Sequence, residues 1–405
     1  MHTFHGPFIR QCLVTKVCDG KTLKVKLNPS GGQVRSRTRE GWEDATVTKK
    51  FPVPLTVERE LEAESTADWE EVTLRLAFVD TEECNEQKKE LAAYKPVTAA
   101  GAEAATWLKK RLGAAADGRC GDVAVDLEFD VATSDERSIE RAREVSQDAY
   151  GRTLAYVWKD GQNINVDVCL SGNSPYFTKH GRSRLYHGEF SLAEKLAVEE
   201  LRGIWNPSQN IAWYSEFKRN YGQLLPWWHQ REMFLEDFRH WQHLGLADHV
   251  ICPRHDYGKL MACAAARETV TVLVDFQPTN FGLYDGIMQF VRYSTSSPSS
   301  PTGVCIYAGT KQQPFNLWMD DADSTEGERV QSLIHHRYSG LSQNFALVTG
   351  KLFIYHAKQR PQMMLESCHQ ITEFPCAPEE MSKMLREHAR TRWSKSKNAT
   401  AFSAA

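Results

Sequence analysis

Short strand-like segments dominate the first two hundred residues and constrain the fold more than any other feature. Residues 9–17 and 22–27 alternate apolar and polar side chains around the turn Cys18-Asp19-Gly20, which predicts a tight hairpin. Further elements follow, namely strands at 72–79, 122–129 and 152–158 and helices at 97–112 and 189–202. Five strands with helices after the third and the fifth predict a mainly β fold, a five-stranded Greek-key barrel of the OB type.

Composition restricts the class of protein. The chain has 405 residues and a formal net charge of -3, which argues against a generally basic nucleic-acid-binding coat but not against local basic patches. It has no apolar run of about eighteen residues, so no membrane association is expected. Ten cysteines without a repeating spacing indicate reduced thiols, and the start lacks a secretion signal, so we expect a cytoplasmic protein.

Shifts in composition divide the chain into four parts. Residues 1–207 form the first predicted domain, with a polar insertion at about 29–70. An aromatic-rich helical connector is expected at 208–265, since Phe234, Phe238 and Trp241 have the spacing of one helix face. Apolar strands resume in 266–378, which we expect to form a second, OB-like barrel that binds nucleic acid. A basic, partly disordered tail is expected at 379–405.

Four short pieces of the first domain carry the groups that phosphodiester chemistry needs. They are Asp19-Gly20-Lys21-Thr22, Arg75, Asp80-Thr81-Glu82-Glu83 and Tyr150-Gly151-Arg152. Arginines can hold a phosphate with forked hydrogen bonds, while carboxylates can bind a hard cation and accept a proton from attacking water. Each piece alone is more often structural, because short motifs recur by chance. Together they predict a site that binds and cleaves phosphodiesters.

In their order and residue types, these motifs resemble the staphylococcal nuclease (thermonuclease) family over residues 9–207, about half of the chain. The motifs that carry the resemblance are Asp19-Gly20-x-Thr22, Arg75-x4-Asp80-Thr81-x-Glu83, Gly101-Ala102-Glu103-Ala104, Tyr150-Gly151-Arg152-x-Leu154-Ala155-Tyr156, Asp160-Gly161 to Asn165, and Ile204-Trp205. In that family calcium sits between two aspartates and a backbone carbonyl, two arginines hold the scissile phosphate, and a glutamate acts on the attacking water. The resemblance implies an OB barrel and a nuclease.

Carried over by position, the resemblance makes Arg75, Arg152 and Glu83 catalytic residues and makes Asp80 and the carbonyl of Thr81 metal ligands. The second family aspartate falls on Lys21, which supplies no oxygen and adds a positive charge. Metal affinity should then be weaker unless another carboxylate completes the site, and the candidates are Asp19, Glu82, Asp68, Glu70 and Glu71. Alternatively, Lys21 itself partly replaces the metal and places a fixed point charge near the phosphate. The expected cofactor is Ca²⁺, with Mg²⁺ or Mn²⁺ as alternatives.

Additional substrate contacts are predicted where aromatic residues alternate with cations. In the first domain these are Tyr150, Tyr176, Lys179 and Arg182, which would stack on bases and neutralise phosphates, unless the aromatic rings belong to the core. The stretch from Val348 to Gln370 resembles the late strands of nucleic-acid-binding OB domains. In it, Tyr355, Lys358 and Arg360 would lie near a binding groove, or else in an ordinary hairpin.

The sequence thus predicts a metal-dependent endonuclease, a phosphodiesterase that hydrolyses DNA or RNA and whose second domain binds nucleic acid. Two alternatives stay open: a catalytically impaired nucleic-acid-binding protein on a nuclease scaffold, and a protein-interaction scaffold. Zinc is not expected, because Cys252, Cys368 and Cys376 lack paired Cys-x2-Cys spacing. The expected partner is nucleic acid, and no protein partner is predicted.

Overall fold

The computed structural model describes residues 4–38, 41–45, 69–85, 97–131, 138–148, 150–207, 221–276, 290–293, 303–309, 313–355, 358–377, 379–383 and 386. The chain forms two compact units. Unit 1 comprises Met1–Thr178 and Arg182–Tyr221, and unit 2 comprises Lys179–Gly181 and Gly222–Ala405. Residues 46–68, within the predicted insertion, lie outside the described part of the chain.

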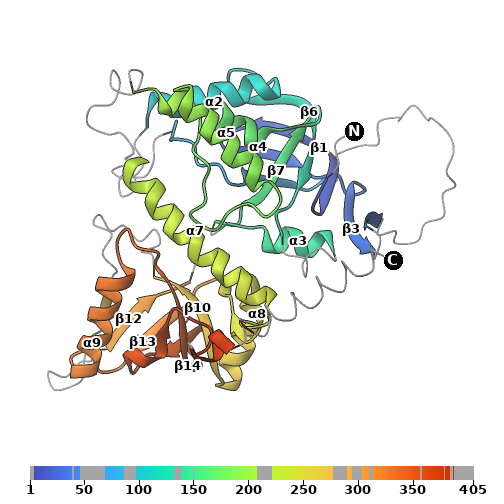
Figure 1. Cartoon of the computed structure of the whole chain (residues 1–405). Coiled ribbons are helices and arrows are strands. Elements are labelled where there is room, and N and C mark those ends of the chain that lie inside the picture. Colours follow the sequence, from blue (N-terminus) through green and yellow to red (C-terminus); the bar gives the residue numbers. More distant parts are fainter. Residues whose placement is uncertain are drawn as a thin grey trace, which may run out of the picture. The chain divides into compact units, whose positions relative to one another are not determined.

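Unit 1 is built on a closed five-stranded barrel (Figure 1). Its strands are β1 (Phe8–Val17), β2 (Thr22–Lys26), β5 (Glu71–Leu76), β6 (Arg119–Glu128) and β7 (Thr153–Lys159). The antiparallel pairs β1–β2, β2–β5, β7–β6 and β6–β1, together with the parallel pair β5–β7, close the ring. The predicted five-stranded OB barrel is confirmed.

Shorter strands and helices surround this barrel. The shorter strands are β3 (Gly32–Thr38), β4 (Gly41–Ala45) and β8 (Gln162–Asn163), and β3 and β4 pair within the predicted insertion. The helices are α2 (Ala99–Leu112), α3 (Ile139–Val145), α4 (Ile164–Leu170), α5 (His187–Glu199) and η3 (Gly203–Trp205). Fully buried residues such as Phe8, Leu23 and Leu74 fill the core, each contributing about 1.5–3 kcal/mol by leaving water.

The helix α2 follows the third barrel strand and begins next to the predicted site. The Thr98 side chain caps it by accepting a hydrogen bond from the amide of Gly101, and Gly113 ends it with a left-handed φ of 67°. The amide of Thr98 donates to the carbonyl of Glu83 at 3.0 Å. The start of the helix is therefore fixed to the backbone of the acidic segment.

Unit 2 contains a second sheet (Figure 1), in which five strands, β12-β13-β15-β14-β10, follow the order of the barrel strands of unit 1, while β11 and β9 are additional strands at the two ends. Its elements are α7 (Tyr221–His243), β9 (Val250–Ile251), α8 (Pro253–Ala266), β10 (Thr269–Asp275), β11 (Phe290–Tyr293), β12 (Gly303–Tyr307), β13 (Asn316–Met319), α9 (Thr325–Leu333), η4 (Ile334–Tyr338), β14 (Phe345–Tyr355), β15 (Arg360–Met364), η5 (Cys368–Gln370) and β16 (Ile371–Thr372). As in unit 1, a helix separates two strands, here β13 and β14, and β13 runs parallel to β15. Among the described residues β10 and β12 do not pair, so closure into a second barrel stays a prediction.

The aromatic residues after Pro226 lie in one helix, as predicted. Phe234, Phe238 and Trp241 are buried in a cluster that includes Phe345 of β14. Beside them the guanidinium of Arg231 is fully buried. It forms two hydrogen bonds with Asp275, at 3.0 and 2.8 Å, and stacks on Phe345, so its charge is compensated within unit 2.

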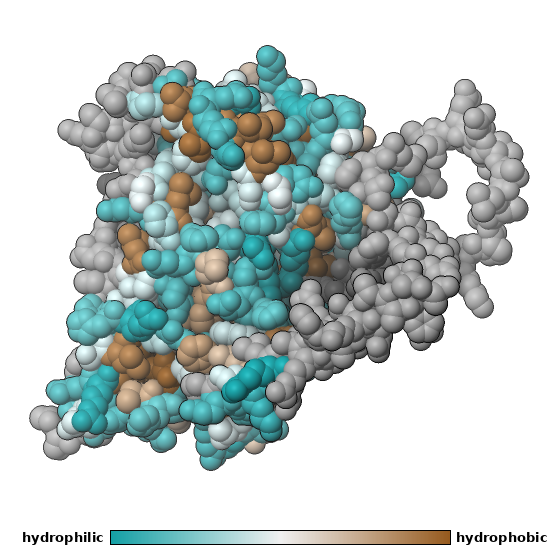
Figure 2. Space-filling view, in the orientation of Figure 1, coloured by the Kyte–Doolittle hydropathy of each residue, from teal (hydrophilic) through white to brown (hydrophobic). Residues whose placement is uncertain are grey.

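The face drawn in Figure 2 is largely hydrophilic and carries separate apolar patches. Exposed apolar side chains include Leu192 and Val198 of α5 and Leu201 just after it. Among the helices that the structure describes, none is long and apolar enough to cross a membrane.

Candidate phosphodiester site

Arg75 lies in β5, and Arg152 lies directly before the neighbouring parallel strand β7. Arg75 is in register with Leu154 in β7, and Arg152 precedes Leu154 by two residues. Side chains alternate between faces with a period of two, so the strand geometry, extended by one residue to Arg152, puts its side chain on the same side of the sheet as that of Arg75. Strand spacing and rise place their Cα atoms roughly 8 Å apart. The barrel register therefore brings together two cations that are 77 positions apart in the sequence.

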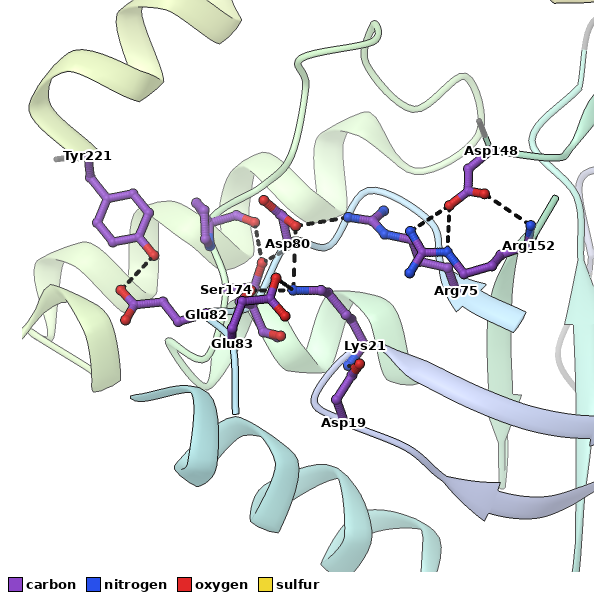
Figure 3. Close-up of polar contacts among 12 residues, drawn as sticks. Asp19, Lys21, Arg75, Asp80, Glu82, Glu83, Asp148, Arg152, Ser174 and Tyr221 are labelled. Atoms are coloured by element: carbon purple, nitrogen blue, oxygen red, sulfur yellow. Dashed lines mark hydrogen bonds and ion pairs between the residues drawn. The ribbon is translucent and has the colours of Figure 1, made fainter. Parts of the chain in front are cut away.

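Lys21 lies at the centre of the predicted metal site (Figure 3). Its ammonium donates to the carbonyl of Thr81 at 2.7 Å and to Oε1 of Glu83 at 2.9 Å, and lies 3.7 Å from Oδ1 of Asp80. The residue is only 4% exposed. The three groups assigned by resemblance to the metal and to the attacking water are thus all bound to one ammonium.

Hydrogen bonds hold both the backbone amide and the backbone carbonyl of Lys21. Its amide donates to Oδ1 of Asp19 at 2.8 Å, and its carbonyl accepts from the amide of Leu76 at 2.8 Å. The turn before it is also tight, because a Cβ on Gly20 would lie 2.9 Å from Ala104 of α2. Asp19, the proposed substitute metal ligand, therefore has a role in the turn that presents Lys21.

Arg75 is almost buried, with 7% of its surface exposed. Its Nη2 donates to Oδ1 of Asp80 at 2.9 Å, and its guanidinium lies 5.3 Å from the ring centroid of Phe177. Asp80 is held in turn by Ser174, whose hydroxyl accepts from the Asp80 amide at 2.8 Å. Within the described residues, the bond to Asp80 is the one hydrogen bond of the Arg75 guanidinium, so its other N–H groups are available to a ligand.

Arg152 is held by a carboxylate four residues before it. Its Nε donates to Asp148 at 2.7 Å and its Nη2 lies 2.6 Å from the same oxygen. The other Asp148 oxygen accepts from the amides of Tyr150 and Arg152. The guanidinium also lies 5.3 Å from the ring centroid of Tyr150, which is 50% exposed. Arg152 is thus oriented, but less buried than Arg75.

The residues of this site do not fit a calcium ion. Calcium takes six to eight oxygen ligands, whereas the oxygens of Asp80, Thr81 and Glu83 already contact the ammonium of Lys21. Among the described residues, no three His, Cys, Asp or Glu side chains form a group that could hold a metal ion. Cys252, Cys368 and Cys376 belong to no such group of described residues either. Of the other nearby carboxylates, Glu82 accepts from the hydroxyl of Tyr221 at 3.0 Å instead of facing Lys21 (Figure 3).

The remaining predicted substrate residues do not all lie at this site. Tyr176 is buried in the core, where its ring stacks on Phe190, and such burial does not fit base stacking. Lys179 belongs to unit 2, with its ammonium 4.9 Å from the ring centroid of Trp227. Arg182 returns to unit 1 and is partly buried.

In unit 2, Tyr355 and Arg360 are brought together as directly opposed residues of the antiparallel pair β14–β15. Tyr355 is 44% exposed, Lys358 in the connection is exposed, and Arg360 is partly buried. Arg360 precedes Gln362 by two residues, and Gln362 is in register with Asn316 of β13. Arg360 thus lies at the start of β15, the strand that by order corresponds to β7 of unit 1.

Two residues of the site, Asp148 and Tyr221, were missed by the sequence reasoning, and two others, Ser174 and Phe177, lie in the stretch of aromatic and cationic residues that was predicted to contact substrate. Asp148, Ser174, Phe177 and Tyr221 contact Arg152, Asp80, Arg75 and Glu82, respectively. Asp148 had a local signal, because an aspartate two residues before Tyr-Gly-Arg is typical of a turn in which the carboxylate caps backbone amides. The others reach the site from distant parts of the chain, so only the fold reveals them.

Comparison with protein families agrees with this architecture. Residues 121–207 match the family model described as staphylococcal nuclease homologue. The match covers β7, α4, α5 and Arg152, while Lys21, Arg75, Asp80 and Glu83 precede it and join it through the barrel pairings. Unit 1 therefore contains a segment, residues 121–207, that matches the staphylococcal nuclease family, and a lysine lies at the centre of the neighbouring site.

Proposed function

We propose that unit 1 binds the phosphodiester backbone of DNA or RNA on a nuclease-type scaffold whose hydrolytic activity is strongly reduced. The observation that carries the proposal is the register in which Arg75 of β5 pairs with Leu154 of β7, two residues after Arg152, from which strand periodicity puts both arginines on one face. Both guanidiniums keep N–H groups without a partner among the described residues, and phosphate oxygens accept such forked donors well.

Reduced hydrolysis follows from the engagement of Glu83. To act as a general base, its carboxylate must reach a water molecule near the phosphate. Here Oε1 is bound to the Lys21 ammonium at 2.9 Å, and the residue is only 9% exposed. The Lys21 ammonium therefore occupies Oε1, one of the two oxygens with which Glu83 could accept a proton. Calcium has no part in the proposal, because its ligands are bound to Lys21.

A second candidate function is a calcium-independent phosphodiesterase. It is favoured by the presence of Glu83, Arg75 and Arg152 in one barrel, part of which, residues 121–207, matches the nuclease family. In such an enzyme Glu83 would accept a proton from the water that attacks phosphorus, while the arginines would stabilise charge on the non-bridging oxygens. The two candidate functions differ only in whether the bound nucleic acid is cleaved.

For unit 2 we propose a second phosphate-binding surface formed by Tyr355, Lys358 and Arg360. Its support is the pairing of Tyr355 with Arg360. One exposed and one partly buried cation next to an exposed aromatic ring suit a single strand, in which bases stack while the backbone is neutralised. All ten cysteines are free thiols, which supports a reducing compartment such as the cytoplasm.

Fluorescence anisotropy with labelled single-stranded DNA, duplex DNA and single-stranded RNA in EGTA tests the binding proposal. Arg75→Ala and Arg152→Ala should each weaken binding roughly 10- to 100-fold, as expected for a lost charge-assisted hydrogen bond. Each should also reduce the salt dependence by about one phosphate contact. The matched control is Arg119→Ala, since the Arg119 side chain is 84% exposed and paired only with the local Asp117.

Wild-type affinity in both arginine variants, with circular dichroism showing a folded barrel, would refute the binding proposal. Gel analysis of the same oligonucleotides separates the two candidates. Turnover that is unchanged by EGTA and abolished by Glu83→Gln would establish the phosphodiesterase. Binding without cleavage would establish the binding protein.

A further inference from the structure

The Lys21 ammonium has as many oxygen-bearing neighbours as it has N–H donors. It carries three N–H donors, and three oxygen-bearing groups surround it: the carbonyl of Thr81 and the carboxylates of Glu83 and Asp80. Two of these contacts are hydrogen bonds, at 2.7 and 2.9 Å. Such convergence of a carbonyl and two carboxylates on one point is the arrangement of a cation site, here filled by a side chain.

The charges at this point balance without any ion. Lys21 and Arg75 supply two positive charges, and Asp80 and Glu83 supply two negative charges, all on residues at most 9% exposed. A divalent cation would leave an excess of two positive charges in a poorly solvated place, where uncompensated charge is strongly unfavourable. The site therefore opposes calcium electrostatically as well as by occupancy.

We infer that Lys21 is a covalently attached substitute for a divalent cation, which organises Asp80, Thr81 and Glu83 and makes unit 1 insensitive to calcium. The inference concerns the site of the proposed function but does not require nucleic-acid binding. Replacing Lys21 by aspartate changes the local charge by two units, the charge of one calcium ion. The introduced carboxylate would join Asp80, Glu83 and the Thr81 carbonyl as oxygen ligands of the type that calcium prefers.

Isothermal titration calorimetry and thermal unfolding, with no nucleic acid present, test this inference. The wild-type protein should show no calcium binding and no change in Tm between EGTA and 10 mM calcium, a concentration of the order at which weak sites fill. Lys21→Asp should have a lower Tm in EGTA, because three carboxylates then meet with one guanidinium. Calcium should raise the Tm of this variant and titrate with a stoichiometry near one.

Lys24→Asp is the matched control. It makes the same charge change on the neighbouring strand β2, at a lysine whose ammonium donates to the Thr73 hydroxyl and not to the site. No calcium response is expected in this variant. An equal response of Lys24→Asp and Lys21→Asp would overturn the inference, as would a folded Lys21→Asp that binds no calcium.

The wild-type titration decides the matter if Lys21→Asp does not fold. Stoichiometric calcium binding by the wild-type protein that is lost in Asp80→Asn would overturn the inference. Two results together would support the inference: the wild type does not respond to calcium, and Lys21→Met has a lower Tm that calcium does not restore. The reason is that methionine removes the cation without supplying an oxygen ligand. Failure of the nucleic-acid assays above would leave each of these outcomes unchanged.

Discussion

At the scale of the residue, the sequence identified the charged groups of the site but not the contacts among them. Arg75, Asp80, Glu83 and Arg152 could be aligned because they lie in short motifs. The position of the Lys21 ammonium could not be predicted, because it depends on a contact across sixty positions in the sequence. Sequence reasoning correctly singled out Lys21 as anomalous, and the fold supplies the reason.

Glu128 is a further buried carboxylate, on which four donors converge. It accepts from the amides of His5 and Gly6, from the indole of Trp158 and from the hydroxyl of Tyr186, and burial raises its pKa despite these donors. Glu128→Gln would place N–H groups against N–H and O–H donors. We expect a loss of roughly 1–3 kcal/mol in the free energy of unfolding, measured by urea denaturation.

Glu103→Gln makes the same chemical change at an exposed position of α2 and serves as the control for Glu128. It should alter the free energy of unfolding by less than about 0.5 kcal/mol. Equal effects of the two substitutions would show that the Glu128 network does not stabilise the barrel.

At the scale of the element, helix α2 is the support of the acidic segment. A Cβ on Gly101 would lie 2.1 Å from the Glu83 carbonyl oxygen, so the helix approaches this backbone more closely than any other residue would allow. The sequence predicted the helix from its periodicity. It could not reveal that a glycine in the first turn sets the position of Glu83.

Gly101→Ala should therefore displace Glu83 and destabilise unit 1, by about 1–3 kcal/mol as in other overpacked sites. Chemical denaturation and the chemical shift of the Glu83 amide would measure both effects. Gly188→Ala is the control, since a Cβ there meets nothing within 4 Å, and in helix α5 it should be neutral or slightly stabilising. A stable Gly101→Ala protein with an unmoved Glu83 would contradict this account.

Glu326 links the first turn of α9 to η5. Its Oε1 accepts from the Ser367 hydroxyl and the Cys368 amide, both at 3.0 Å, and these hydrogen bonds lower the pKa of the carboxyl to about 2. A lowered pKa in the folded state means that the stabilisation is present above the unfolded pKa of 4.5 and is lost as the pH falls toward 2.

Glu326→Gln should thus destabilise unit 2 at pH 7, and the difference from the wild type should shrink below pH 4.5. Urea denaturation between pH 3 and pH 7 would measure this dependence. A difference that grows toward acid pH would contradict the assigned hydrogen bonds.

At the scale of the whole molecule, each of the two units has its own core, and five strands of each follow the same order. The order of unit 1 could be predicted because its five strands alternate clearly and its motifs resemble a known family. In unit 2 the strand β13 and the helix α9 were missed, since elements of four and nine residues give too little periodicity. The residues that pair β13 with β15 were therefore beyond prediction.

Separate cores predict that local damage stays within one unit. Arg231→Lys removes the paired hydrogen bonds to Asp275 and should increase amide exchange in β10 and β14 of unit 2. Exchange in β1 and β6 of unit 1 should be unaffected, as hydrogen-exchange mass spectrometry can measure. Equal deprotection of β1 and β6 would show that the two units unfold as one.

Because the ammonium of Lys21 is covalently attached, the filling of this site does not depend on the concentration of a free ion. A site held together by a dissociable ion gains stability in proportion to the logarithm of the ion concentration, and loses it on dilution or in a chelator. At Lys21 the cation is a part of the polypeptide, so its local concentration is set by the β1–β2 turn and is the same in every medium. The barrel should therefore keep its site assembled wherever the chain folds, whether free calcium is scarce or abundant.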